Sequence, residues 1–342
     1  MTDGWWRVLV TGAAGGLGRV MCRVLQQSGY DVKGLARPED PIGSIPLPRE
    51  RIIIGYVQDA ATIALAMKDV DTVVHCAALL PKALHMDERA FESVNAEGPV
   101  TVMRQAIAQG LNRVIFFSTI SVVDHVRRKI TPAELFDFVP DPHDAYLRSK
   151  IEAERRLITL SPLFGGHLAV IRPAFIYGPG NYAVWRESLD LTMNGKMRLL
   201  DGGRAIVPLI YAEDIGRYIV ALLGQPAPAV RYDLHIVSNP QRTTMRDVFD
   251  FIANYLRVPC PGSIPSLPLR MLANMLQPLP LWMRAGRLKL LTPARVVQYS
   301  QGYDLSEDLY QPLLSQIPMT DYRDGLESML DEFTRLRAEV AS

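Results

Sequence analysis

A tyrosine and a lysine four residues apart form the pair in this sequence best suited to move a proton. Tyr146 and Lys150 lie in segment 145–160, where apolar residues recur at helical spacing, so both side chains project from one helical face. A free phenol has a pKa of about 10, too high for ready proton exchange near neutrality, and a neighbouring ammonium stabilises the phenolate. The pair predicts a general acid/base, although 13 tyrosines could also produce such a spacing by chance.

Two hydroxyl residues stand where they could act on the same substrate. Ser118 and Thr119 end the apolar run RVIFFS, and the helix that carries Tyr146 follows. In an open α/β sheet, ligands bind outside the carboxyl ends of the strands, so a hydroxyl there can donate to a substrate carbonyl.

A glycine-rich turn near the start of the chain has the context of a nucleotide-binding loop, between a strand and a helix. Gly12 permits the tight turn, Gly15 lets the backbone approach a pyrophosphate, and Gly18 allows close packing of helix against strand. Free N–H groups at Gly16 and Leu17 would face the anion. The same pattern also occurs in turns without a ligand, and it predicts a dinucleotide but no particular reaction.

The residue at the end of the second strand bears on the choice of dinucleotide. An acid is normally expected here to accept from the ribose 2′-hydroxyl of NAD, but Arg37 stands at this place. Asp31, Glu39 and Asp40 are off the expected position, whereas a guanidinium can clamp a 2′-phosphate. We therefore expect NADP (NADPH) rather than NAD, the alternative being that Arg37 is a solvated surface residue.

The segments that must position these residues alternate between two patterns. Nearly continuous apolar runs predict strands buried on both faces, and longer segments with helical spacing predict crossover helices. The predicted strands are 7–12, 30–36, 51–55, 71–77, 113–118 and 167–172, and the main helices are 16–28, 88–109 and 145–160. The alternation predicts an α/β fold with a Rossmann-type doubly wound parallel sheet.

The second half of the chain predicts a smaller unit. Prolines become frequent after about Gly180, and the turn residues of 259–269 predict a loop. Segment 206–223 predicts a strand, a turn and a helix that return to the first domain. We expect a dinucleotide-binding domain over 1–180 with a return segment at about 206–235, and a C-terminal substrate-binding α/β region over 181–205 and 236–342.

Taken in order, these motifs resemble the extended short-chain dehydrogenase/reductases over about residues 7–220. Tyr56 departs from the pattern, because it stands where the family often has the first acid of GDxxD. The matching features are TGxxGxxG at 11–18, Asp59 after the third strand, HCAA at 75–78, Asn95 in VNAEG, Ser118-Thr119, YxxxK at 146–150, RPAFIYGPG at 172–180 and Asp214.

The resemblance implies hydride transfer at a nicotinamide. Tyr146 would be the acid/base, and Lys150 would lower the pKa of the phenol and hold the ribose. Thr119, three residues before Val122, would orient the substrate oxygen in preference to Ser118, with Ser121 as a third candidate. Asn95 would complete a proton relay. The further cofactor contacts that the resemblance implies are Asp59, Ala77, Ala78, Ser118 and the backbone from Pro173 to Ile176.

Two reactions within this family share those residues. Nucleotide-sugar epimerases and dehydratases recycle a tightly held NAD and commonly carry an Arg-Asp pair a few residues before the late acid, which anchors a diphosphate. Aligned on Asp214, these positions are Val207 and Pro208, and the run IVPLIYAED is closer to 3β-hydroxysteroid dehydrogenases and dihydroflavonol-type reductases. We expect an oxidoreductase that interconverts a ketone and a secondary alcohol on a small, non-nucleotide, hydrophobic molecule, with the epimerase/dehydratase as the alternative. A binding-only redox sensor or scaffold is a third reading, disfavoured because the catalytic residues are all present.

The composition limits the remaining classes. The 342 residues include 37 Lys and Arg against 36 Asp and Glu, and a net charge of +1 argues against nucleic acid or an anionic surface as partner. Cys22, Cys76 and Cys260 have no metal-ligand spacing, so we expect no metal. The sequence has no span for a bilayer and no secretion signal at its start, so we expect a cytoplasmic protein. The family resemblance allows a homodimer through helices 88–109 and 145–160.

An apolar, methionine-bearing segment at 267–283 is left without a clear role. It could close over a greasy substrate, because Met adapts to irregular ligands, but a stripe of this kind is more often core or a dimer face.

Overall fold

The structure is a computed structural model that describes residues 7–80, 87–123, 130–132, 135–136, 138, 141, 144–181, 184–279, 283, 288, 291–310 and 312–341. A seven-stranded sheet, parallel throughout, organises it, with the strand order β10-β6-β5-β4-β1-β2-β3. Its strands are β1 (Arg7–Thr11), β2 (Asp31–Ala36), β3 (Ile52–Ile54), β4 (Thr72–His75), β5 (Arg113–Phe117), β6 (His167–Pro173) and β10 (Tyr232–Val237). The α/β, doubly wound fold class predicted from the sequence is confirmed.

The sheet has a switch point between β1 and β4. The chain runs from β1 through β2 to β3 in one direction and then from β4 outward in the other, so the connections after β1 and β4 diverge. A crevice at the carboxyl ends of strands is expected at such a point. The glycine loop follows β1, and Ala77 and Ala78 follow β4, so the fold brings these two predicted segments together.

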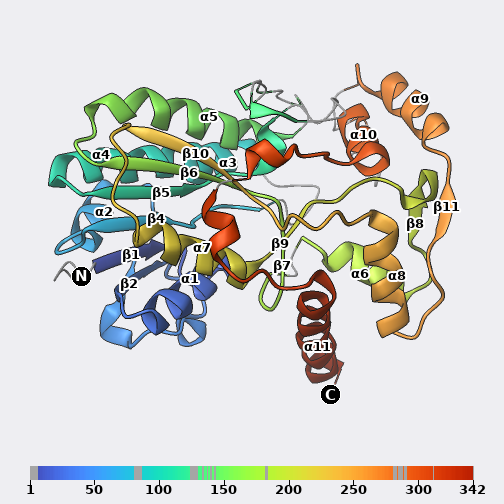
Figure 1. The fold of residues 1–342 in the computed structure, drawn as a ribbon, viewed down its shortest axis with the longest axis horizontal. Coiled ribbons are helices and arrows are strands. Elements are labelled where there is room, and N and C mark those ends of the chain that lie inside the picture. Colours follow the sequence, from blue (N-terminus) through green and yellow to red (C-terminus); the bar gives the residue numbers. More distant parts are fainter. Residues whose placement is uncertain are drawn as a thin grey trace.

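Helices cover both faces of this sheet, as Figure 1 shows. Val8 and Val10 of β1 point into one core with α1, whereas Leu9 points into the other, because side chains alternate along a strand. The covering helices are α1 (Gly16–Gln27) and α7 (Ala212–Leu223), in contact with each other, and α2 (Ala60–Ala66), α4 (Gly98–Gln109) and α5 (Ala145–Leu160). Before α4 the chain forms α3 (Glu88–Phe91) and a π-helical turn, Glu92–Glu97.

A second unit lies beyond the carboxyl edge of the sheet, on the right of Figure 1. Its core includes Trp185, Phe249 and Leu326. Its two small sheets pair β7 (Phe175–Tyr177) with β9 (Leu209–Tyr211), and β8 (Arg198–Leu200) with β11 (Gly262–Ile264). Its helices are α6 (Arg186–Met193), α8 (Met245–Tyr255), α9 (Ser266–Leu276), α10 (Pro293–Gln301) and α11 (Tyr322–Ala341).

The prediction of a loop over 259–269 was wrong for part of that range. β11 occupies Gly262–Ile264, and α9 begins at Ser266 despite Pro268. A proline is tolerated in the first turn of a helix, because its missing N–H would have no partner within the helix there. The turn residues therefore marked the start of a helix.

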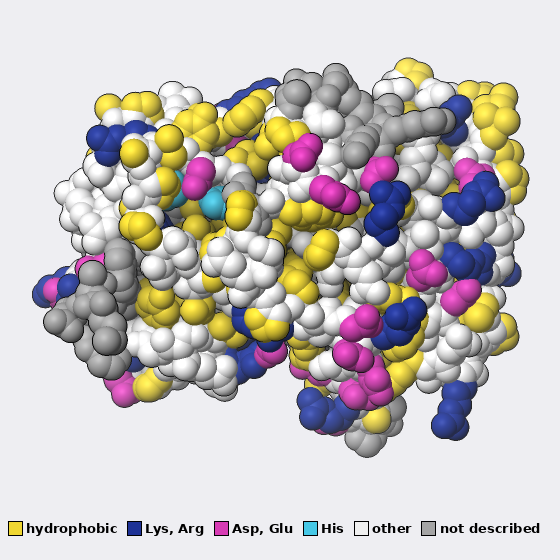
Figure 2. Space-filling view, viewed as in Figure 1, with side chains coloured by type: hydrophobic (Ala, Val, Ile, Leu, Met, Phe, Trp, Pro, Cys, Tyr) yellow, Lys and Arg dark blue, Asp and Glu magenta, His cyan; other side chains and the backbone are white. Residues whose placement is uncertain are grey.

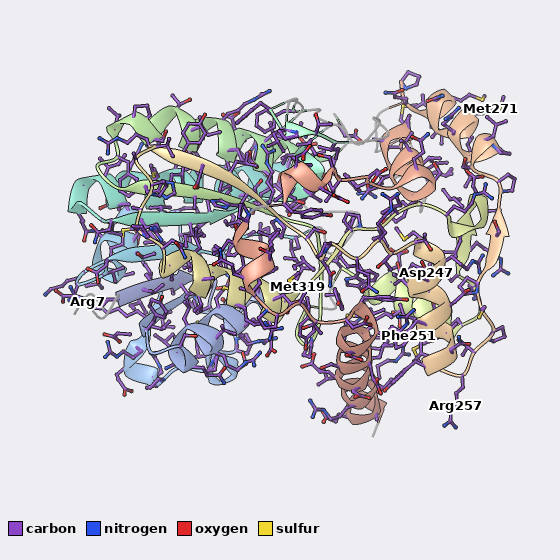
Figure 3. All side chains as sticks on the ribbon, in the orientation of Figure 1. Arg7, Asp247, Phe251, Arg257, Met271 and Met319 are labelled. Atoms are coloured by element: carbon purple, nitrogen blue, oxygen red, sulfur yellow. The ribbon has the colours of Figure 1, made fainter. Side chains whose placement is uncertain are left out.

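The described part of the apolar segment 267–283 is not core; Leu281 and Trp282 lie outside the described residues. Only Ala273 of α9 is buried, and Leu267, Met271 and Met275 are 58%, 61% and 74% exposed. Yellow side chains accordingly cover the corner of the surface where α9 lies (Figure 2), and Met271 stands at the outer rim of the molecule (Figure 3). Within the described part of the chain, no helix is long and apolar enough to cross a membrane.

Candidate active site

The glycine loop has the geometry that close packing demands. Gly12 has φ +66°, and a Cβ there would lie 2.7 Å from the Cα of Ala77. At Gly18 a Cβ would lie 2.0 Å from the carbonyl oxygen of Gly12. These two positions therefore exclude any side chain.

The start of α1 is fitted to bind an anion. Gly15 is its N-cap residue and has no side chain with which to accept from the first N–H groups, those of Gly16 and Leu17. In contrast, Asp59 caps α2 and Asp144 caps α5. Uncapped N–H groups and the helix dipole together favour a phosphate at this end of α1.

A loop from the second unit lies over the same helix end. A Cβ on Gly16 would lie 2.3 Å from the carbonyl oxygen of Gly180, in the YGPG segment after β7. The N–H of Gly180 donates to a carboxylate oxygen of Glu332, on α11, at 2.5 Å. The nucleotide loop and the C-terminal helix are thus linked through Gly180.

Arg37 follows β2 and is ion-paired. Its Nε and Nη2 donate to Asp40, with an Nη2 distance of 2.7 Å, and its Nη1 lies 3.1 Å from Glu39. Tyr56 donates to the same Glu39 at 3.2 Å. The hydrogen bond to Asp40 and the nearby carboxylates raise the pKa of Arg37 above its ordinary value. Sequence reasoning set Glu39 and Asp40 aside, whereas the structure brings both against Arg37.

Asp59, the predicted adenine contact, caps the N-terminus of α2 with its side chain. One carboxylate oxygen accepts from the N–H of Ala61 at 3.0 Å, and the other accepts from the hydroxyl of Thr62. These hydrogen bonds hold the pKa of Asp59 below its ordinary value. A role toward adenine stays a prediction for this exposed carboxylate.

His75 is the last residue of β4 and is buried. Its Nδ1 is 2.8 Å from the hydroxyl of Thr11, and the N–H of Ala77 donates to that same hydroxyl at 3.3 Å. Burial, with a smaller contribution from the charge of Lys150, lowers the pKa of His75 to about 3. The ring is therefore neutral and structural at physiological pH. Ala78 follows, half-buried.

Tyr146 and Lys150 lie one turn apart on α5, beside the end of β5. The Lys150 ammonium donates to the carbonyl of Phe117 at 2.9 Å and lies 5.0 Å from the ring centre of Phe116. The Tyr146 ring packs edge-on against Phe91. The predicted pair thus reaches the carboxyl edge of the sheet from one helix face.

Burial is the main influence on the pKa of both residues of this pair. Burial lowers the pKa of Lys150 to about 8, against an opposing effect of Glu154. The pKa of Tyr146 is raised, by burial first and by the charge of Asp144 second. Loss of water around the phenol is the main cause, and the effect of Lys150 that the family resemblance implies stays a prediction.

Asn95 lies within the π-helical turn and is fully buried. Its amide accepts from the N–H of Leu79 at 2.8 Å and donates to the carbonyl of Leu79 and to the hydroxyl of Ser149. Ser149 in turn donates to the carbonyl of Tyr146 at 2.7 Å. Asn95 therefore holds the segment after β4 against the helix that carries Tyr146.

The three hydroxyl candidates have different surroundings. Ser118 is 5% exposed, and its Oγ has no hydrogen-bond partner among the described residues. Thr119, half-buried, accepts from the N–H of Ser121 at 3.3 Å. Ser121 accepts from the hydroxyl of Tyr303 at 3.3 Å. None of the three hydroxyl groups donates in these contacts, so the preference for Thr119 stays a prediction.

The predicted backbone contacts lie where β6 passes into β7. Pro173 ends β6, and the carbonyl of Ile176 accepts from the indole N–H of Trp185 at 2.9 Å. Farther along, Val207 and Pro208 are buried. The places aligned with the diphosphate anchor of nucleotide-sugar enzymes are thus packed with apolar side chains.

Sequence reasoning missed a buried ion pair between α5 and β6. Glu154 and Arg172 are both fully buried and bonded through two nitrogens of the guanidinium. The spacing Tyr146, Lys150, Glu154 is one residue per helical turn, so the sequence contained this signal.

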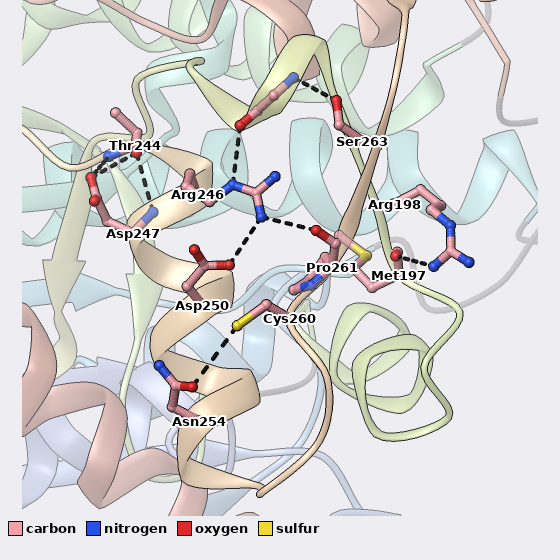
Figure 4. Close-up of polar contacts among 11 residues, drawn as sticks. Met197, Arg198, Thr244, Arg246, Asp247, Asp250, Asn254, Cys260, Pro261 and Ser263 are labelled. Carbon is pink, nitrogen blue, oxygen red and sulfur yellow. Dashed lines mark hydrogen bonds and ion pairs between the residues drawn. The ribbon is translucent and has the colours of Figure 1, made fainter.

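A cavity of about 280 Å³ lies elsewhere, between α6 and the start of β11, and is lined by Thr192, Met197, Arg198 and Cys260. Figure 4 shows the contacts around it: Arg246 binds the carbonyls of Gly202 and Pro261. No predicted site residue lines this cavity. Among the residues described, no cluster of His, Cys, Asp or Glu could hold a metal ion.

The sequence matches the NAD dependent epimerase/dehydratase family over residues 8–236, which contain both the glycine loop and the Tyr146/Lys150 pair. The chain belongs to this family. The resemblance to the extended short-chain dehydrogenase/reductases is thereby confirmed.

Curated proteins with related sequences differ in activity. The 3-beta-hydroxysteroid dehydrogenase of Mycolicibacterium neoaurum is 27% identical over 206 residues, 58% of this chain and 56% of that protein. The UDP-glucose 4-epimerase of Vibrio cholerae is 31% identical over 199 residues, 55% of this chain and 57% of that protein. The chain therefore spans little more than half the length of these relatives.

Solved structures similar to this family member agree over nearly the whole chain. Gox2253 has a TM-score of 0.76 at 19% identity, covering 96% of this chain and 98% of its own. The UDP-glucose 4-epimerase of Thermus thermophilus, solved with NAD, has a TM-score of 0.67 at 18% identity, covering 96% and 99%. These similarities establish a shared fold.

Proposed function

We propose that this protein is an NADP(H)-dependent oxidoreductase that interconverts a ketone and a secondary alcohol, with Tyr146 as general acid/base. The observation that carries the proposal is the position of Tyr146 and Lys150 on one face of α5, with Lys150 bonded to the carbonyl of Phe117 at the end of β5, at the carboxyl edge of the sheet where α1 also begins. A bound nicotinamide supplies or takes the hydride. Gly16 and Leu17 would hold the pyrophosphate of the dinucleotide.

Side chains of this protein have the other roles in the proposed reaction. Tyr146 gives a proton to the ketone oxygen in reduction and removes it from the alcohol in oxidation. Thr119 donates a hydrogen bond to that oxygen, and Lys150 holds the ribose. Asn95, which donates to Ser149 on α5, would complete the proton-relay tetrad.

The preference for NADP(H) rests on Arg37. Its guanidinium lies beyond β2, where the adenosine ribose is expected, and can make bidentate contacts to a 2′-phosphate. Because Asp40 and Glu39 now bind it, the phosphate would have to displace at least one carboxylate.

That same ion pairing favours a second candidate. Acidic side chains at the end of β2 can accept from the 2′-hydroxyl of NAD, and the Vibrio relative is a UDP-glucose 4-epimerase. A nucleotide-sugar epimerase or dehydratase with tightly held NAD is therefore the alternative. Buried Val207 and Pro208 favour the ketone substrate, as does the 3-beta-hydroxysteroid dehydrogenase relative.

The nucleotide released on denaturing freshly purified protein separates the two candidates. An empty protein that takes up NADPH reversibly, oxidises it with apolar ketones and shows no thermal shift with UDP supports the oxidoreductase. Near-stoichiometric release of NAD, together with thermal stabilisation of the protein by UDP, would instead support the nucleotide-sugar epimerase or dehydratase.

The homodimer expected from the family resemblance would use α4 and α5, and light scattering of the purified protein tests it. A monomer at micromolar concentration would remove this part of the proposal.

A further inference from the structure

Arg19, the fourth residue of α1, lies against the loop that covers the start of this helix. A Cβ on Gly180 would lie 2.9 Å from the Nη2 of Arg19 and 3.8 Å from the Cα of Gly16, the first residue of α1. Because Gly180 has φ +74° and no side chain, the guanidinium can lie close to the backbone of this loop. Side chains of an α-helix lean toward its N-terminus, so the charge of Arg19 is placed at the uncapped end of α1.

Within the described part of the chain, the charge of Arg19 has no carboxylate partner. Arg23, one turn farther along the same helix, is in contrast ion-paired with Glu213. The Nη1 of Arg19 donates to the hydroxyl of Ser44 at 3.4 Å, which is long for a hydrogen bond. Most N–H donors of this half-buried guanidinium are therefore available to an anion.

Other groups than Arg19 hold the covering loop in place. Glu332 accepts from the N–H of Gly180 at 2.5 Å, and the side-chain amide of Asn181 donates to the carbonyl of Pro179 at 3.0 Å. Among the residues that the structure describes, no hydrogen bond joins Arg19 to this loop. A purely structural role therefore explains the position of Arg19 poorly.

We propose that Arg19 binds the pyrophosphate of the dinucleotide, as a basic anchor beside the N–H groups of Gly16 and Leu17. A guanidinium presents paired N–H donors that match two phosphate oxygens, and such charge-assisted contacts are stronger than neutral ones. The helix dipole favours the same negative charge. The inference rests on the dinucleotide binding that both functions proposed above share, and hydride transfer does not enter it.

Calorimetric titration of ADP-ribose into the full chain, dialysed free of nucleotide, tests the proposal. ADP-ribose carries the pyrophosphate without a nicotinamide or a 2′-phosphate, so its binding is independent of the reaction. Arg19→Gln should weaken binding by about tenfold or more, and Arg19→Lys, which keeps the charge but loses the planar fork, should weaken it less. The matched control Arg23→Gln removes an ion-paired arginine from the same helix and should bind like the wild type.

The salt dependence of binding separates a direct contact from a distorted loop. Affinity of the wild type for ADP-ribose should fall as potassium chloride is added, and the fall should be less steep for Arg19→Gln, because one charged contact is gone. Weaker binding with an unchanged salt dependence would assign Arg19 a structural role and overturn the proposal. Matching thermal melts establish that the variants are folded.

Adenosine 2′-monophosphate distinguishes the other phosphate of NADP. Ser44, the hydrogen-bond partner of Arg19, follows β2 as Arg37 does, so the 2′-phosphate is the rival ligand. We expect Arg19→Gln to bind this nucleotide as the wild type does. Weaker binding of adenosine 2′-monophosphate with unchanged binding of ADP-ribose would overturn the assignment to the pyrophosphate, as would failure of the wild type to bind ADP-ribose.

Discussion

Glu154 and Arg172 form a fully buried ion pair that joins α5 to β6. The Nε of Arg172 lies 3.0 Å from one carboxylate oxygen and its Nη2 lies 2.5 Å from the other, while Nη1 donates to the carbonyl of Leu135 at 2.6 Å. Because Glu154 also raises the pKa of Lys150, the pair opposes part of the effect of burial on that ammonium. A structural ion pair thus helps to keep the proposed catalytic lysine charged.

Replacing Glu154 by Gln should destabilise the protein strongly, because it leaves the Arg172 charge buried without a partner. We expect a loss of about 3 to 5 kcal/mol in the free energy of unfolding, measured by urea denaturation. Glu152→Gln, on the exposed side of the same helix, is the control and should cost less than about 0.5 kcal/mol. Equal losses for the two variants would contradict the assigned role of the pair.

Replacing Tyr146 by Phe should remove the proton donor and leave the ring packed against Phe91. We expect kcat to fall by about 100-fold or more, with nucleotide affinity unchanged. Tyr255→Phe, which removes a hydroxyl bonded to Asp331 on the second unit, should keep its activity. Substantial turnover by Tyr146→Phe would rule out this tyrosine as the acid/base.

The depressed pKa of His75 predicts a loss of stability in acid. Its folded-state pKa is about 3, below the ordinary 6.5, so protons bind the unfolded chain more tightly. The contribution is complete above about pH 6.5 and is lost as pH falls toward 3, at about 1.4 kcal/mol per pH unit within that window. Urea denaturation from pH 7 to 4 measures the slope.

Two variants separate this effect from general acid sensitivity. His75→Asn keeps an acceptor near Thr11 but does not titrate, so its slope should be shallower by that amount. Thr11→Val should cost about 1 kcal/mol at every pH and keep the slope of the wild type. Parallel curves for wild type and His75→Asn would show that another group controls the acid limb.

Selectivity for NADPH should depend on Arg37. Arg37→Ala should weaken NADPH binding by about tenfold or more, since a charge-assisted contact to the 2′-phosphate is lost, and change NADH binding little. Asp40→Asn should act in the opposite direction, because it removes a carboxylate that competes with the phosphate. Titration of both nucleotides against each variant measures these effects. A preference for NADH in the wild type would refute the role given to Arg37.

The main sheet was predictable because its strands are buried on both faces. The runs that include Val8, Val73 and Ile115 are apolar without interruption. Such a run predicts a buried strand whichever strands pair with it. The strands β7, β8, β9 and β11 have three residues each, too few for a periodic pattern, and their pairing depends on contacts distant in sequence. α9 was missed because Pro268 signals a turn unless it is known to stand in the first turn of a helix.

The site, too, was predictable only where short-range spacing along the sequence determines it. Motif spacing placed Tyr146, Lys150 and Gly12 correctly at the edge of the sheet, because one helix or one turn fixes each spacing. The pairing of Arg37 with Asp40 and the capping role of Asp59 depend on side-chain geometry, which the motif does not specify. The raised pKa of Tyr146 depends on how much water the fold removes, and this too cannot be read from a spacing.

The hydrogen bond from Gly180 to Glu332 has a consequence for synthesis of the protein. During translation the glycine loop leaves the ribosome near the beginning, but the carboxylate that holds the Gly180 segment over it is made some three hundred residues later. A nascent chain that lacks α11 lacks this hydrogen bond, so the Gly180 segment is expected to become fixed over the glycine loop only once α11 has been made.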